Sequence, residues 1–196
     1  MMTTREELVD GLVKKGTLKD QRIQKAFLTV DMLPFLPAQY KGMAYEDRPI
    51  PFYDKGNIVR TISAPHMIAT ILQSLELKDG LKILILGSKS GYIEALIAST
   101  VKVGNLQVVD LNAQICTVTK ENLGRKYPVI KVSPGDPTKG LAKGKPWDRI
   151  LVTGQVEAIP DTLKTQLSAS GFIVAPVGDL RVQKLVKLSK EGKAFR

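Results

Sequence analysis

One stretch, Lys82 to Tyr92, constrains the fold of this chain more than any other. A run of apolar residues stops abruptly at Gly87, a turn of small residues follows, and the residues after Tyr92 have the pattern of a helix. A strand, a glycine turn and a helix in this order open a nucleotide-binding βαβ unit, in which the start of the helix and the bare backbone receive a polar ligand. We therefore expect a ligand-binding loop between Gly87 and Gly91.

The residues after 65 continue this alternation of helices and strands. We expect helices over 67–77, 92–100, 112–125 and 161–167, a turn at Gly171, and strands over 83–86, 106–109, 129–132, 149–152 and 172–175. Alternation of this kind predicts an α/β fold, a three-layer αβα sandwich with a doubly wound, mostly parallel sheet. Ligands of such a sheet bind at the carboxyl ends of its strands.

The first 62 residues have a different pattern. Thr4 to Glu7 has the sequence of a capping box, and an apolar pattern at Leu8, Leu12 and Val13 follows it. A second helix is expected from Asp20, with one apolar face formed by Ile23, Ala26, Phe27 and Val30. Pro34 and Pro37 interrupt helical structure, and residues 38–62, rich in proline and aromatic residues, are expected to form an irregular, packed functional loop.

Composition excludes several classes of protein. A chain of 196 residues fits a single domain with its own core, and no apolar run approaches the roughly 18 residues that cross a bilayer. Cys116 and His66 are the only residues of their kinds, so an internal disulfide, a cysteine-rich metal site and a multi-histidine site are excluded. We expect a cytoplasmic protein without a metal site.

The chain carries a formal net charge of +10, from 29 basic and 19 acidic residues. Such a charge favours contact with polyanions through long-range attraction. A lysine-rich surface in water is an equally good interpretation, and no RNA-binding signature adds to the case for nucleic acid.

Two acidic residues follow predicted strands of the same sheet. Asp110 comes about 20 residues after the glycine turn, where an acidic residue of a nucleotide-binding unit hydrogen-bonds the ribose hydroxyls. Its alternative role is to stabilise the start of the next helix. Asp136 follows Gly135 after the third strand and could accept a hydrogen bond from an adenine amino group, or serve only as a turn residue.

Ser63 lies just before the first helix of the α/β part. It could cap that helix, with Pro65 in the first turn. His66 alone indicates no more than a surface or core histidine.

Thr61-Ile-Ser-Ala-Pro-His-Met67 resembles the signature of the protein-L-isoaspartate O-methyltransferase family. The seven-residue segment is specific, whereas the glycine turn alone is not. The likeness covers almost the whole chain, through Lys25–Asp31, Phe35–Pro37, Ala44–Pro51, Trp147–Ile150, Ile159–Pro160, Gln166–Leu167 and Pro176–Gly178.

The resemblance implies a Rossmann-like methyltransferase fold and S-adenosylmethionine as the cofactor. It implies methyl transfer to the carboxylate of L-isoaspartyl residues, so that damaged proteins are the partners. Carried over residue by residue, the family's active-site serine is Ser63, and its cofactor-binding positions are Gly87, Ser88, Gly91, Asp110 on the ribose and Asp136 near the adenine.

Four features depart from the family's pattern. Ile85 replaces a usual acidic residue, Lys89 a glycine of the cofactor loop, and Pro137 the glycine after the Gly-Asp pair, while Arg196 ends the chain before the family's terminal strand. These changes predict weakened cofactor binding. They leave open a catalytically degenerate paralogue that acts as a binding or scaffold module, and, from the charge, a methyltransferase redirected to a partner such as RNA.

The same resemblance divides the expected single domain, residues 1–196, into three parts. Residues 1–62 provide the N-terminal helices and a loop on the substrate side, and residues 63–180 form the cofactor-binding α/β core. Residues 181–196 carry six basic residues and one acidic residue, and are expected to form an edge strand and a basic tail.

Overall fold

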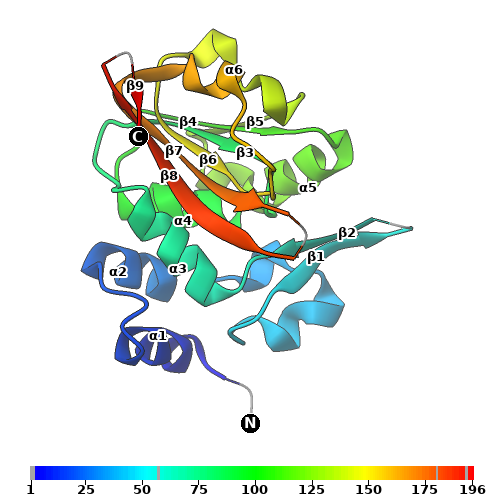
Figure 1. Ribbon diagram of the computed structural model, residues 1–196. Helices are drawn as coiled ribbons and strands as arrows, with labels where there is room; N and C mark the ends of the chain where they lie inside the picture. Colours follow the sequence, from blue (N-terminus) through cyan, green and yellow to red (C-terminus); the bar gives the residue numbers. More distant parts are fainter. Residues whose placement is uncertain (1–2, 57, 180, 193) are drawn as a thin grey trace. The chain divides into compact units, whose positions relative to one another are not determined.

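The computed structural model describes residues 3–56, 58–179, 181–192 and 194–196, which form two compact units (Figure 1). The first unit contains the chain up to Leu77 together with residues 89–101 and 118–127. The second contains residues 78–88, 102–117 and 128–196. No helix among the described residues is long and apolar enough to cross a membrane.

The second unit is built on a seven-stranded sheet with the order β5-β4-β3-β6-β7-β8-β9. The strands from β5 to β7 are parallel, whereas β8 and β9 are antiparallel to their neighbours. Their bounds are β3 Lys82–Leu86, β4 Asn105–Asp110, β5 Ile130–Pro134, β6 Trp147–Val152, β7 Leu167–Gly178, β8 Gln183–Glu191 and β9 Ala194–Phe195.

This topology confirms the predicted α/β class with a doubly wound, mostly parallel sheet. The chain adds β4 and β5 on one side of β3 and then β6 and β7 on the other, so the order reverses between β3 and β6. Ligands of doubly wound sheets bind at the carboxyl ends of the strands beside such a reversal. Figure 1 shows β7 and β8 as two long strands side by side, and β9 returns along β8.

Apolar strand segments form the core of the second unit. Leu84, Ile150 and Ile173 are fully buried, and they pack with Leu163 of the short helix α6 Asp161–Lys164. Strands buried on both faces read as continuous apolar runs, which is why the sequence located the apolar part of each strand. The helix expected over 161–167 is wrong at its end, because α6 stops at Lys164 and β7 begins at Leu167.

The turn predicted at Gly171 is wrong. β7 continues through this residue, with a shift in its register against β6 near Trp147. A Cβ atom on Gly171 would lie 2.7 Å from the carbonyl oxygen of Trp147. The glycine therefore allows two backbones to approach closely within the sheet.

The first unit contains helices α1 Arg5–Lys14, α2 Gln21–Thr29, α3 Pro65–Ser74 and α4 Tyr92–Thr100, and the later turns of α5 Ala113–Leu123. The predicted capping box is confirmed, because Thr4 and Glu7 exchange side chain-to-backbone hydrogen bonds. Asp20 caps α2 as predicted. The buried face of α1 uses Val9, whereas Val13, predicted for that face, is 39% exposed.

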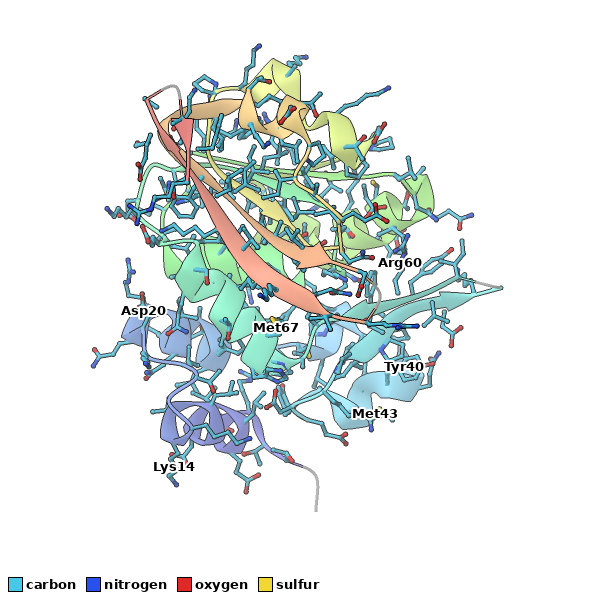
Figure 2. The ribbon with its side chains drawn as sticks, in the orientation of Figure 1. Lys14, Asp20, Tyr40, Met43, Arg60 and Met67 are labelled. Carbon is cyan, nitrogen blue, oxygen red and sulfur yellow. The ribbon has the colours of Figure 1, made fainter. Side chains whose placement is uncertain are left out.

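Residues 38–62 are not the irregular loop that the sequence predicted. They form the 3₁₀ helix η2 Ala38–Met43 and a hairpin of β1 Ile50–Lys55 and β2 Ile58–Ile62. A shift in register between Pro51 and Tyr53 breaks the alternation of apolar residues, and this concealed the strands. The hydroxyl of Tyr40, labelled with Met43 on η2 in Figure 2, donates to Asp54 of β1 over 2.8 Å.

Candidate functional site

Asp110 ends β4 and holds the start of the glycine turn in the second unit. One carboxylate oxygen accepts the backbone N–H of Ser88, and the other accepts that of Asn112, each over 2.8 Å. The side chain is buried, with 8% of its surface exposed. A carboxylate offers about four acceptor positions, so about two remain for the vicinal hydroxyls of a ribose.

Gly87 needs to be glycine for two independent reasons. Its φ of +90° lies in the left-handed region, and a Cβ atom there would lie 2.6 Å from the hydroxyl oxygen of Thr153. Its N–H donates to Val109 over 2.8 Å, and its carbonyl accepts the Thr153 hydroxyl over 2.6 Å. The backbone of the turn is therefore held from both neighbouring strands, as a preformed ligand loop requires.

Asp136 caps a turn beside the same strand ends. The N–H of Gly135 donates to the carbonyl of Asp110 over 2.9 Å, which joins the two acidic segments. Asp136 accepts the hydroxyl and N–H of Thr138 at 2.6 and 2.9 Å, and these hydrogen bonds hold the pKa of its carboxyl below the ordinary value. The structure thus provides the turn role, and the contact with adenine stays a prediction.

This corner of the sheet fits the sugar of a nucleoside cofactor. A buried carboxylate with acceptor capacity lies next to a glycine whose added Cβ would meet a side chain. The residue two places before Gly87 is the uncharged Ile85. It is fully buried and pairs with Val108 and Leu151 in the sheet. Any counter-charge for a cationic ligand must come from other residues.

Ser63 lies between β2 and α3 in the first unit and is half-buried. The helix cap predicted for it is wrong: Ala64 occupies the cap position, without a side-chain hydrogen bond. Asp47 serves instead, accepting the backbone N–H of His66 over 2.9 Å and contacting its ring nitrogen at 2.8 Å. Pro65 stands in the first turn, as predicted. With the helix start satisfied by Asp47, the serine hydroxyl is released from the capping role.

Ser90 and Gly91 complete the turn and belong to the first unit. Both have positive φ, +64° and +94°. The carbonyl of Ser90 accepts the side-chain amide of Asn122 over 3.0 Å. A Cβ atom on Gly91 would lie 2.9 Å from Leu123, so this glycine permits close packing at the start of α4.

Three supporting residues were missed by reasoning from the sequence. Thr153 holds Gly87, Asn122 holds Ser90, and Asp47 holds the start of α3. Two of them had a signal: Thr153 directly follows a predicted strand, and strand carboxyl ends gather at one edge of a parallel sheet. Asp47 lies in the Ala44–Pro51 segment that resembles the family. Within the described part of the chain, no group of three metal-binding side chains lies together.

Comparison with known proteins adds independent evidence. A family model described as protein-L-isoaspartate(D-aspartate) O-methyltransferase (PCMT) matches residues 3–196. A protein-L-isoaspartate O-methyltransferase of Pyrobaculum islandicum is 36% identical over 95% of this chain and 89% of its own length. One of Methanopyrus kandleri is 36% identical over 98% of this chain and 85% of its own length.

Solved structures show a similar relationship. A protein-L-isoaspartate O-methyltransferase structure matches 96% of this chain with a TM-score of 0.86 and 30% identity, and this chain spans 60% of its length. A structure from Plasmodium falciparum, in complex with S-adenosyl-L-homocysteine, matches 97% of this chain and 91% of its own, with a TM-score of 0.80. At 22% identity, this second match supports the fold alone.

Proposed function

The chain belongs to the protein-L-isoaspartate(D-aspartate) O-methyltransferase family, and from this premise we propose that it methylates the carboxylate of L-isoaspartyl residues in damaged proteins, with S-adenosylmethionine as the methyl donor. One observation carries the proposal. The Asp110 carboxylate accepts the Ser88 N–H over 2.8 Å, next to a glycine held at φ +90°. A buried acceptor beside a preformed glycine turn suits the ribose of a nucleoside cofactor.

The residues of this chain suit the reaction. A carboxylate with an ordinary pKa of about 4 is already ionised at neutral pH, so the substrate needs no general base. When bound, S-adenosylmethionine supplies an electrophilic methyl group. The protein's part is to align the carboxylate with that group and to exclude water, which is catalysis by proximity and orientation. Ser63 donates its hydroxyl to the substrate carboxylate and positions it.

The cofactor contacts are divided among the predicted positions. Asp110 accepts the ribose hydroxyls, Asp136 accepts the adenine amino group, and the backbone at Gly87, Ser88 and Gly91 contacts the methionine part. Because Ile85 is apolar and buried, the ribose contact provides a larger share of the affinity than it would beside an acidic residue.

The partners are proteins or peptides that contain isoaspartyl residues, and the compartment is the cytoplasm. A buried single cysteine supports this location, since the fold requires no disulfide. We further propose that the residues act as one methyltransferase domain. The alternative, a degenerate scaffold module, is not favoured, because the family match spans residues 3–196 and Asp110 retains its acceptor capacity.

The activity is tested with a synthetic peptide that contains one L-isoaspartyl residue and with cofactor labelled on its methyl group. We expect an ester that releases labelled methanol in mild base. The matched control is the same peptide with ordinary aspartate, which should accept no label. Equal labelling of both peptides, or of neither, would contradict the proposed function.

A further inference from the structure

A groove rich in lysine lies in the second unit over β4 and β5, from the amino end of β3 to Ser133 near the carboxyl end of β5. Its volume is about 430 Å³. We call it the lysine groove, and the residues that carry its chemistry are Lys82, Gln107, Lys131, Ser133, Lys143 and Lys145. A hollow of this volume is large enough for a small-molecule ligand.

Polar side chains on one face of the sheet form the floor of the lysine groove. Gln107 pairs with Leu84 on one side and with Lys131 on the other, so the three side chains share this face. On the same face Leu84 and Val109 pack in the core with Leu163. In contrast Ser133, the partner of Val109 in β5, lines the groove. Parallel sheets are normally covered on both faces, so a polar, partly exposed floor indicates a surface kept for another purpose.

The connection from β5 to β6 forms the wall of the groove and is held in place. It crosses with two 3₁₀ turns, Pro137–Lys139 and Ala142–Gly144, in place of a long helix. The indole N–H of Trp147 donates to the carbonyl of Leu141 over 3.1 Å, and Gln166 accepts the N–H of Leu141 over 2.8 Å. The wall is therefore preformed.

The groove is strongly cationic, and the ammonium group of Lys82 lies 5.7 Å from the centre of the Trp147 ring. No acidic residue lines it, and among the described residues none of its four lysines forms a salt bridge. Asp148, the acid next to Trp147, already accepts the N–H of Lys82 over 2.9 Å and the hydroxyl of Ser168 over 2.8 Å. The four lysine ammonium groups, with the Gln107 amide and the Ser133 hydroxyl beside them, can donate hydrogen bonds to the oxygens of several phosphates.

We propose that the lysine groove binds a small ligand that carries two or more phosphate groups, a nucleoside triphosphate or inorganic tripolyphosphate. Gln107 of the groove and Asp110 are three positions apart in β4, so their side chains point to opposite faces of the sheet and the two sites are distinct. Nucleic acid fits less well, because single strands bind through aromatic stacking and no aromatic side chain lines the groove among the residues that the structure describes.

Calorimetry of the full chain with tripolyphosphate tests this proposal. We expect a dissociation constant below about 100 μM in about 50 mM salt, weakening steeply as salt is added. Lys131→Gln combined with Lys143→Gln should weaken binding by about tenfold or more. The matched control is Lys25→Gln combined with Lys184→Gln, which removes the same charge from exposed positions elsewhere and should change the affinity by less than about twofold.

Competition separates the two sources of phosphate. If adenosine triphosphate and tripolyphosphate displace each other with similar constants, the phosphate chain is the recognised part. If the nucleotide binds about tenfold tighter and the Lys131→Gln, Lys143→Gln variant weakens it equally, its nucleoside is also recognised in the groove. Tighter nucleotide binding that this variant does not weaken would occur at Asp110 and Asp136 and would count against the groove. Three results would overturn the proposed site. They are no binding of tripolyphosphate at about 1 mM, equal weakening by the control pair of substitutions, and RNA binding that tripolyphosphate does not displace. S-adenosylmethionine titrated into the same samples reports on the proposed methyltransferase site independently.

Discussion

At both ends of the parallel strands in the second unit, a carboxylate accepts a backbone N–H, but the two ends suit different ligands. At the carboxyl end, Asp110 accepts the N–H of Ser88, just after β3. At the amino end, Asp148 accepts the N–H of Lys82, the first residue of β3. Each carboxylate therefore fixes one end of the same central strand.

What surrounds the two carboxylates differs. Asp110 has Gly87 and Gly135 as neighbours, and Asp136 follows in the same region. The amino end gathers lysines, and the second carboxylate oxygen of Asp148 is occupied by the hydroxyl of Ser168. One sheet thus presents acceptors and open backbone at one end and cationic donors at the other. This difference is the basis for proposing ligands of opposite charge at the two ends.

The largest expected effect separates the two carboxylates directly. Asp110→Ala should weaken S-adenosylmethionine binding by about a hundredfold, since charged hydrogen bonds to two ribose hydroxyls are lost. Asp148→Ala is the matched control. It also removes a carboxylate that caps β3, and should lower the free energy of unfolding while leaving cofactor affinity nearly unchanged. Calorimetry and urea unfolding measure both quantities, and equal loss of affinity in the two variants would break the comparison.

The second effect concerns the backbone at the carboxyl end. Gly87→Ala should lower the free energy of unfolding by about 2 to 3 kcal/mol, because it forces a side chain into the left-handed region and against Thr153. The matched control is Gly154→Ala, whose added Cβ would have nothing within 4 Å. It should change the free energy of unfolding by less than about 0.5 kcal/mol.

A double variant sharpens this result. Thr153→Ala in the Gly87→Ala background relieves the contact with the hydroxyl but not the backbone conformation, so it should restore only part of the loss. Urea unfolding of the natural chain, Gly87→Ala, Thr153→Ala and the double variant measures the difference. Full restoration would show that the positive φ contributes nothing.

A smaller effect is expected at Ser63 in the first unit. Ser63→Ala should lower kcat/KM for the isoaspartyl peptide by about tenfold, or about 1.4 kcal/mol, because one hydrogen bond to a charged group is lost. S-adenosylmethionine affinity and thermal stability should not change, since Asp47 and not Ser63 satisfies the start of α3. A fall in stability that accounts for the lost activity would contradict a positioning role.

The smallest effect depends on pH. Hydrogen bonds from Thr138 lower the pKa of Asp136 in the folded chain, so its ionised form stabilises the fold above the unfolded pKa. That contribution is lost as the pH falls through the lowered folded pKa. Asp136→Asn should therefore be slightly less stable than the natural chain at pH 7 and equal to it in acid below that pKa. Urea unfolding across this range checks the sign, and a difference independent of pH would exclude the linkage.

The sequence predicted the α/β core because its strands are continuous apolar runs separated by glycine turns and helices. It did not predict the β1–β2 hairpin, because Pro51 and the adjacent register shift remove the alternation that identifies a strand. Asp110 was predicted because an acidic residue after this strand of a nucleotide-binding unit binds the ribose; the structure shows only that it holds the N–H groups of Ser88 and Asn112. Asn122 acts through a contact with Ser90, far away in the chain, and no local pattern reveals such a contact.

Titration of S-adenosylmethionine into the unmodified chain tests the central claim most directly. We expect one site with a dissociation constant at or below about 100 μM, which includes an allowance for the missing acidic residue at position 85. Binding at this level would establish that the carboxyl end of the sheet is a working cofactor site. Absence of binding at about 1 mM would contradict it, and would leave Asp110 only the task of holding the turn.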